Sequence, residues 1–279
     1  MRTLLVLIVL ALSLQLRGAD ITFVDAGVKA VCVANWDSNG DGELSEEEAA
    51  AVTTLGSVFR ERTDIGEFPE LRYFTSLPAI NDSAFYKSSI KGELRVPGNV
   101  NTIGDYAFDG CSLLTNVVLE EGVDTIGWHS FSGPIKTLSL PASLRFMYSM
   151  AVNPYVNGEP SGTIFIPEGD LYVYAKSKTP APINEYAFYY VFYAGHLVVP
   201  YGCKEAYKAA KGWSYFGEYI EMGDVNGDGR LDIADVTLLI AFIQGREHTE
   251  TEARIADVNG DGVLDGKDVE LLCQYLLGS

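Results

Sequence analysis

The chain has 279 residues, a length that suits about two domains and is long enough to bury a core. Its 20 basic and 38 acidic residues give a formal net charge of −18 at pH 7, which argues against nucleic-acid backbones and anionic membrane surfaces as partners. Hydrophobic residues make up 47% of the chain, so it is not intrinsically disordered, and four cysteines are too few for a disulfide scaffold.

The first segment predicts a secretory signal peptide. Met1 and Arg2 precede an apolar stretch over residues 3–16, and small residues follow at Gly18 and Ala19. Such a stretch is too short for a membrane-spanning helix. We therefore assign residues 1–19 to a signal peptide and expect an exported mature protein. The alternative, an uncleaved core helix, is disfavoured because the stretch lacks helix caps.

Residues 20–60 predict a calcium-binding unit. In the acidic loop 37–48, Asp or Asn occupies positions 1, 3 and 5, glycine position 6, an apolar residue position 8 and glutamate position 12. This is the EF-hand pattern, and it suits calcium, which takes six to eight oxygen ligands. The alternative is an acidic turn that caps a helix without metal. The predicted ligands are Asp37, Asn39, Asp41, Glu43 (through its carbonyl), Ser45 and Glu48.

The centre of the chain repeats every 23 residues. The pattern I-x-x-x-A/S-F starts at Ile80, Ile103 and Ile126, and each copy is accompanied by a short β-type run such as L-R-V-P at 94–97. A fixed period of this length indicates a solenoid in which each turn supplies one short strand and one apolar corner. The pattern returns less regularly after an insertion near residues 153–182.

The I-G-x-x-A-F and L-x-V-P patterns resemble the BspA-like leucine-rich repeats of bacterial surface proteins over about residues 65–221. The resemblance implies adhesion or protein recognition at a cell surface rather than catalysis. Residues 199–221 are similar to the helical end-cap of that family, in which an EF-hand unit like residues 20–60 often precedes the first repeat. That unit would cover the open edge of the solenoid. We assign residues 61–221 to the solenoid and its cap.

The aromatic residues near the end of the repeats and the four cysteines do not belong to any of these motifs. Phe and Tyr are dense over residues 171–201, and on a solenoid face they would stack on sugars or anchor a protein ligand. Packing between the last repeats and the cap is the favoured alternative. The cysteines are expected to be buried free thiols because no close pair suggests a disulfide; they are Cys32, Cys111, Cys203 and Cys273.

Two further acidic loops, 224–235 and 257–268, duplicate one another with an offset of 33 residues. Both have the pattern D-x-N-x-D-G-x-L-D-x-x-D, and the register continues through the apolar residues that follow. The duplication indicates two loop–helix units that bury their apolar faces against each other. The predicted calcium ligands are Asp224, Asn226, Asp228, Arg230, Asp232 and Asp235 in the first loop, and Asp257, Asn259, Asp261, Val263, Asp265 and Asp268 in the second.

Tandem loops of this form, each followed by one helix, resemble a dockerin type I module over residues 222–279, with aspartate in place of the EF-hand glutamate at position 12. The resemblance implies a small calcium-dependent unit that binds a cohesin module on a scaffold or cell surface. Recognition residues of that family often occupy loop positions 10 and 11. These are Ile233 and Ala234 in the first repeat, which is the more apolar, and Gly266 and Lys267 in the second. The alternative is a calcium-binding cap without a partner.

The sequence contains no recognisable catalytic motif. None of His129, His196 and His248 belongs to an H-E-x-x-H pattern, and no G-x-S-x-G occurs. The spacing of carboxylates along the sequence does not test for a glycoside hydrolase site, because the distance between the two catalytic carboxylates is set in three dimensions. The repeats, however, fill the central region and leave no room for a catalytic domain. We therefore expect a protein that is not an enzyme.

The expected fold is mixed α/β and has three parts: an EF-hand helix pair, a leucine-rich-repeat β-solenoid with short strands, and an α-helical calcium module. The expected protein is secreted or at the cell surface, with Ca²⁺ as a structural cofactor. Its solenoid would present an adhesion surface to a host protein or a glycan, and its C-terminal module would bind a cohesin-type partner. Two alternatives stay open: a component of a polysaccharide-degrading complex whose solenoid binds glycan, and an adhesin whose module is only a cap.

Overall fold

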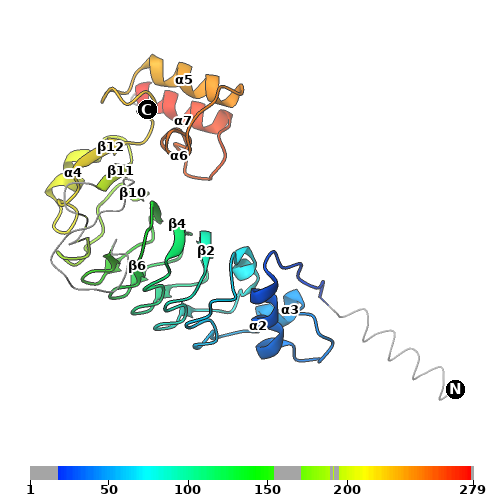
Figure 1. The fold of residues 1–279 in the computed structure, drawn as a ribbon. Coiled ribbons are helices and arrows are strands. Elements are labelled where there is room, and N and C mark those ends of the chain that lie inside the picture. Colours follow the sequence, from blue (N-terminus) through cyan, green and yellow to red (C-terminus); the bar gives the residue numbers. More distant parts are fainter. Residues whose placement is uncertain (1–17, 154–170, 189–190, 192–194, 278–279) are drawn as a thin grey trace.

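The structure is a computed structural model that describes residues 18–153, 171–188, 191 and 195–277 (Figure 1). It shows a β-solenoid with helices at both ends, so the predicted mixed α/β fold is confirmed. Most of the predicted signal peptide, residues 154–170 of the predicted insertion, and four of the predicted aromatic residues (Tyr189, Tyr190, Phe192 and Tyr193) lie outside the described residues. Within the described part of the chain, no helix is long and apolar enough to cross a membrane.

All paired strands of the solenoid run parallel, as expected for a chain that winds in one direction. One sheet has six strands in the order β2 (Lys91–Val96), β4 (Leu113–Leu119), β7 (Thr137–Leu140), β10 (Leu171–Ala175), β11 (Gly195–Val199) and β12 (Glu218–Glu221). The opposite sheet has four short strands, β1 (Ala79–Ile80), β3 (Thr102–Ile103), β5 (Thr125–Ile126) and β8 (Phe146–Met147). A two-stranded sheet pairs β6 (Phe131–Ser132) with β9 (Val152–Asn153).

The repeated phenylalanines form a stack through the solenoid core. Ring centroids are 4.9 Å apart for Phe59 and Phe85, 5.0 Å for Phe85 and Phe108, and 5.3 Å for Phe108 and Phe131. The ring planes within each of these pairs lie within 13° of parallel. The repeated isoleucines are equally buried, so each turn packs its motif against the same motif of the next turn.

Close approach between turns explains the glycine of the I-G-x-x-A-F motif. A Cβ at Gly104 would lie 2.8 Å from the carbonyl carbon of Asn81, and one at Gly127 would lie 2.7 Å from that of Gly104. In the third copy, Ser130 replaces the motif alanine and is fully buried. Its hydroxyl donates to the carbonyl oxygens of Gly104 and Gly127, both at 2.8 Å, so the buried polar group is satisfied.

The N-terminal unit packs on the first turn of the solenoid. Its helices are α2 (Ala26–Trp36) and a short α3 (Glu46–Ala50), and the 3₁₀ helix η1 (Pro69–Tyr73) follows at the start of the segment assigned to the solenoid. Trp36 contacts Phe74 and Phe59, with ring centroids 5.4 Å and 6.1 Å apart. The buried residues of this unit belong to the same apolar cluster as those of the solenoid.

The C-terminal end of the solenoid differs from the expectation in one respect. The predicted helical end-cap contains α4 (Lys204–Ala209) and the buried Trp213, whose Nε1 donates to the carbonyl of Ala181 at 2.8 Å. The cap then ends in a strand, β12, which pairs with β11 and was not predicted. A strand forms there because the edge of β11 would otherwise keep unpaired backbone groups.

The C-terminal module has its own small core around Leu239, Ala256 and Leu272. Its helices are α5 (Ile233–Ile243), α6 (Glu250–Ala256) and α7 (Gly266–Leu277). The helices after the two acidic loops were predicted, and α6 between them was not. Its sequence signal is the capping box of Thr249 and Glu252, which the structure contains.

The four cysteines are free thiols, as predicted, and lie in different parts of the fold. Three of them are buried. Cys273 on α7 is only half-buried, so the expectation of burial was wrong for this residue.

Candidate calcium loops and the surfaces around them

The three acidic loops share one hydrogen-bond pattern. In each loop the carboxylate at position 1 accepts a hydrogen bond from the N–H of the glycine at position 6, and the position-3 amide oxygen accepts one from the N–H at position 5. The glycines at positions 4 and 6 have positive φ, which glycine adopts without strain. The position 1–6 distances are 2.9 Å for Asp37–Gly42, 2.9 Å for Asp224–Gly229 and 2.8 Å for Asp257–Gly262.

The side chain at position 12 closes each loop, although it is glutamate in the N-terminal loop and the shorter aspartate in the two module loops. It accepts hydrogen bonds from the backbone N–H groups of positions 3 and 9 in all three loops. Asp235 and Asp268 have no exposed surface, and Glu48 is also bound by Ser38 and Ser45. The shorter aspartate therefore reaches the same backbone groups as the EF-hand glutamate.

The donor set of these loops fits calcium. Each supplies carboxylate, amide and backbone oxygens, the ligands that calcium prefers. In the first module loop, Asp224 Oδ1 is buried and has no hydrogen-bond partner among the described residues, and such a group is expensive to bury without a cation or a donor. No group of three or more His, Cys, Asp or Glu side chains converges as a metal cluster in the described residues. The loop carboxylates instead accept hydrogen bonds from their own backbone.

Carboxylates crowd one another in the module loops. Burial raises the pKa of Asp224, and the charges of Asp235 and Asp228 raise it further. Burial likewise raises the pKa of Asp257, with Asp268 and Asp261 adding to the effect. A bound cation favours the ionised carboxylates and removes this repulsion.

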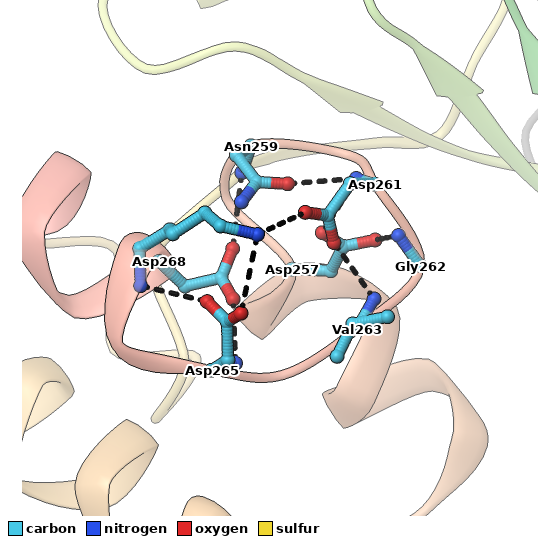
Figure 2. A network of polar contacts seen from close by, with 8 residues as sticks. Asp257, Asn259, Asp261, Gly262, Val263, Asp265 and Asp268 are labelled. Carbon is cyan, nitrogen blue, oxygen red and sulfur yellow. Dashed lines mark hydrogen bonds and ion pairs between the residues drawn. The ribbon is translucent and has the colours of Figure 1, made fainter.

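In the second module loop, shown in Figure 2, a lysine side chain lies close to two of the carboxylates, Asp261 and Asp265. Lys267 Nζ lies 3.4 Å from Asp261 Oδ2 and 3.3 Å from Asp265 Oδ2. The hydrogen bond from the N–H of Val263, together with Lys267, lowers the pKa of Asp261. The first module loop has Ala234 at the position of Lys267 and carries its base, Arg230, at position 7, so the two loops have the same formal charge but place the basic side chain differently.

The predicted partner-binding residues lie at the starts of α5 and α7. Ile233 is 71% exposed, and Ala234, Gly266 and Lys267 are also exposed. The structure adds Ile240 and Ile243, which sequence analysis missed, because both are exposed on α5. Their signal was the spacing: the buried apolar residues of α5 are Val236, Leu239 and Phe242, and the two isoleucines directly follow Leu239 and Phe242.

Part of the outer face of the six-stranded sheet is covered by the C-terminal module, a contact that sequence analysis did not predict. Val118, Tyr174 and Val198 alternate with inward-facing residues, yet they are 6%, 3% and 0% exposed. Tyr174 and Val198 pack with Met222 and with Ile255 of α6, which Figure 1 shows beside this sheet. Of the predicted aromatic residues, Tyr174 lies in this contact and Phe188 in the solenoid core.

A row of exposed and half-buried rings lies on the side of the solenoid away from the six-stranded sheet. Tyr106, Trp128 and His129 come from two successive turns, and their three pairwise ring-centroid distances are 4.8, 5.6 and 4.5 Å. His129 Nε2 lies 3.3 Å from Met150 Sδ in the next turn. We call the following residues the aromatic ridge: Tyr106, Trp128, His129, Phe146, Tyr148 and Tyr186.

The three histidines do not assemble a catalytic group. His129 belongs to the aromatic ridge. His196 on β11 pairs with Glu218 of β12 and stacks on Tyr172, with ring centroids 4.4 Å apart. His248 lies beside Phe242 in the module, 5.0 Å away between ring centroids.

Comparison with known protein families finds two matches. Residues 63–154 match the BspA type leucine rich repeat region in six copies, and residues 222–277 match the dockerin type I domain. Both predicted resemblances are confirmed over these ranges. The N-terminal acidic loop lies outside both matches. Among curated proteins, no relative matches the chain.

Proposed function

We propose that this chain, which combines a BspA-type leucine-rich-repeat region with a dockerin type I domain, is an exported surface protein anchored through its C-terminal module to a cohesin-type partner. Repeats and modules of these kinds are typically extracellular and non-catalytic. The finer parts of the proposal are an adhesion surface on the solenoid and calcium in all three acidic loops. The exposed isoleucines of α5 are the observation that carries it.

The exposed face of α5 is apolar where a solvent-facing helix is normally polar. Ile233, Ile240 and Ile243 are 71%, 37% and 39% exposed. In the duplicated half, the residues at the equivalent positions are Gly266, Cys273 and Leu276, a less apolar set. Figure 1 shows α5 on the side of the module away from the solenoid, where a partner has access. An apolar patch of this kind marks a protein interface.

The test uses the full mature chain and a panel of cohesin modules, with binding measured by biolayer interferometry in calcium and in chelator. We expect calcium-dependent binding that Ile233→Asp weakens at least about 100-fold, because a buried unpaired charge at an interface centre costs several kcal/mol. The matched control is Gly266→Asp at the equivalent position of the second repeat, expected to change affinity less than about twofold. Stronger loss in the control would place the partner on α7, and no binding to any cohesin would leave the module as a cap.

The proposed calcium ligands are those predicted for the three loops. The shared hydrogen-bond pattern and the buried, unpartnered Asp224 Oδ1 support the assignment. Bound calcium would supply positive charge that neutralises the crowded carboxylates. Isothermal calorimetry on Asp37→Asn, Asp224→Asn and Asp257→Asn tests it: each variant should lose one binding event. A wild-type protein that takes up no calcium would refute the assignment.

For the adhesion surface we propose the aromatic ridge, because it runs across successive turns and exposes Trp128, Tyr148 and Tyr186 by 37%, 49% and 43%. Exposed rings of this kind favour the second candidate function, glycan binding within a polysaccharide-degrading complex. The test is retardation of the mature chain in native gels that contain xylan, mannan or xyloglucan. Retardation that is lost in Trp128→Ala/Tyr148→Ala, and kept in the control Leu113→Ala on the other sheet, supports a glycan ligand. Unretarded wild-type protein favours a protein ligand.

A further inference from the structure

The contact between the module and the solenoid contains two long-range polar links in addition to its apolar residues. Arg254 of α6 donates through Nη2 to Glu93 Oε2 of β2 at 3.1 Å and to Glu250 Oε1 at 2.8 Å. Its guanidinium also lies 5.8 Å from the ring centre of Tyr174 on β10, and its side chain is only 19% exposed. One arginine therefore joins α6 to two strands of the sheet.

The second link reaches the calcium loop itself. Lys176, which directly follows β10, donates from Nζ to the carbonyl oxygen of Gly260 at 2.7 Å. Gly260 is position 4 of the second module loop and has φ +74°. The lysine contacts a backbone carbonyl rather than a carboxylate, so the contact depends on the shape of the loop more than on its charge.

The end of α7 adds a third contact. Tyr275 stacks on Tyr201 of the solenoid cap with ring centroids 5.8 Å apart and an interplanar angle of 26°. Lys178 Nζ lies 5.7 Å from the centre of the Tyr275 ring. A pocket of about 60 Å³ remains between the two parts, and its lining includes Arg95 from the sheet and Asp261 from the loop.

The first module loop lacks the equivalent contact. A Cβ added at Gly227 would meet nothing within 4 Å, whereas one at Gly260 would lie 3.2 Å from Lys176 Cε. The two halves of the module therefore differ in their contacts. The second loop and α6 contact the solenoid, whereas Gly227 of the first loop has no solenoid atom near its Cβ position.

We propose that the second module loop and α6 form a calcium-dependent clasp that holds the module on the outer face of the six-stranded sheet. Loss of calcium releases the clasp and uncovers Tyr174, Val198 and Met222. The inference rests on the proposed calcium binding. The two halves of the module then have different roles. The second loop and α6 bind the solenoid, and loop 224–235 with α5 is available to a partner.

The physical reason lies in how the loop is connected to α6. The helix ends at Ala256, and Asp257 is both its C-cap and position 1 of the loop, so the shape of the loop sets the direction of α6. Lys267 compensates Asp261 and Asp265. Without a bound cation, however, the carboxylates of the half-buried Asp257 and the buried Asp268 repel each other and the loop loses its shape. The Gly260 carbonyl and Arg254 then leave their partners on the sheet. By linkage, docking on the sheet must raise the calcium affinity of this loop by the same factor.

The first experiment compares two equivalent aspartates by hydrogen–deuterium exchange on the full mature chain in calcium. We expect Asp268→Asn to increase exchange in α6 and in β10, because it weakens the second loop. Asp235→Asn, at position 12 of the first loop, should leave β10 protected. Equal protection of β10 in wild type with and without chelator, alongside normal calcium uptake, would overturn the clasp and leave the proposed function intact.

Because Asp268→Asn alters the loop itself and can unfold the module, the second experiment changes only the solenoid. Calorimetric calcium titration of Lys176→Met should show one site weakened about fivefold or more, the usual lower bound of coupling between sites. The matched control is Lys136→Met, an exposed lysine that precedes β7, and it should bind calcium like the wild type. Unchanged affinity in Lys176→Met would overturn the clasp, and absent uptake in the wild type would refute both the clasp and the proposed calcium sites.

Discussion

The solenoid and the C-terminal module of this chain are stabilised by different interactions. In the solenoid, each turn repeats the same apolar contacts, and the Phe85, Phe108 and Phe131 rings are stacked without solvent exposure above 1%. The module has a core of only a few buried residues and two loops that crowd aspartates together. The solenoid therefore depends on packing, whereas we expect the stability of the module to depend on cations and on pH.

The largest expected effect is a loss of stability that is confined to the solenoid. Phe108→Ala removes the middle ring of a buried stack and should lower the free energy of unfolding by about 3–5 kcal/mol. Denaturant unfolding followed by tryptophan fluorescence measures it. The control is Tyr148→Ala on the exposed ridge, which should change stability by less than about 0.5 kcal/mol. A large loss in the control would mean that the ridge is part of the core.

The next effect concerns the module alone. If calcium is about 100 times its dissociation constant, each occupied site that exists only in the folded state adds about 2.7 kcal/mol. Scanning calorimetry with and without chelator should therefore show the module transition fall in temperature while the solenoid transition stays. A shared shift of both transitions would show that the two parts unfold as one unit.

A smaller effect compares helix caps at the two ends of the chain. Thr249 caps α6 and Ser45 caps α3, and in each case the side-chain oxygen accepts a hydrogen bond from the N–H three residues later. Thr249→Ala and Ser45→Ala should each cost about 1 kcal/mol. Hydrogen exchange should place the loss in the module for the first variant and in the N-terminal unit for the second. An unchanged α6 in Thr249→Ala would show that the contact with the sheet, rather than the cap, maintains this helix.

The smallest effect is a pH dependence that has one sign in the two module loops and the opposite sign in the N-terminal acidic loop. Burial raises the pKa of Asp224 and Asp257 above the ordinary value of 3.8, so their protonated forms stabilise the calcium-free module. That contribution is complete below pH 3.8 and is lost as the pH rises through the raised values. Although burial opposes it, hydrogen bonding from Ser45 and Ser38 lowers the pKa of Glu48 to about 2. Its contribution is present above the ordinary value of 4.5 and is lost as the pH falls towards 2.

The measurement is urea unfolding of the chelated protein between pH 3 and pH 7, followed by hydrogen exchange in each part. In Asp224→Asn/Asp257→Asn, the acid-side gain of the module should disappear while the N-terminal unit keeps its own profile. If the stability of the module still falls with rising pH in this variant, other carboxylates cause the pH dependence.

Most of the local structure follows from sequence patterns that act over short distances. The positions of Asp, Asn and Gly in the three loops predict hydrogen bonds within twelve residues, and those bonds are present. The 23-residue period predicts the stacked Phe and Ile positions because each turn meets only its neighbours. The α6 helix also has a local signal, the Thr249 and Glu252 capping box, which lies outside the repeated loop pattern.

What the sequence by itself determined is therefore the winding of the solenoid, the shape of the acidic loops and the two families that they match. Only the tertiary structure decided which surfaces stay exposed. Glu93 meets Arg254 across 161 residues and Lys176 meets Gly260 across 84, and no periodic pattern encodes such pairs. Tyr174 and Val198, at outward positions of β10 and β11, are buried because Met222 and the α6 residue Ile255 pack on them, and α5 remains exposed because the module contacts the solenoid through its other half.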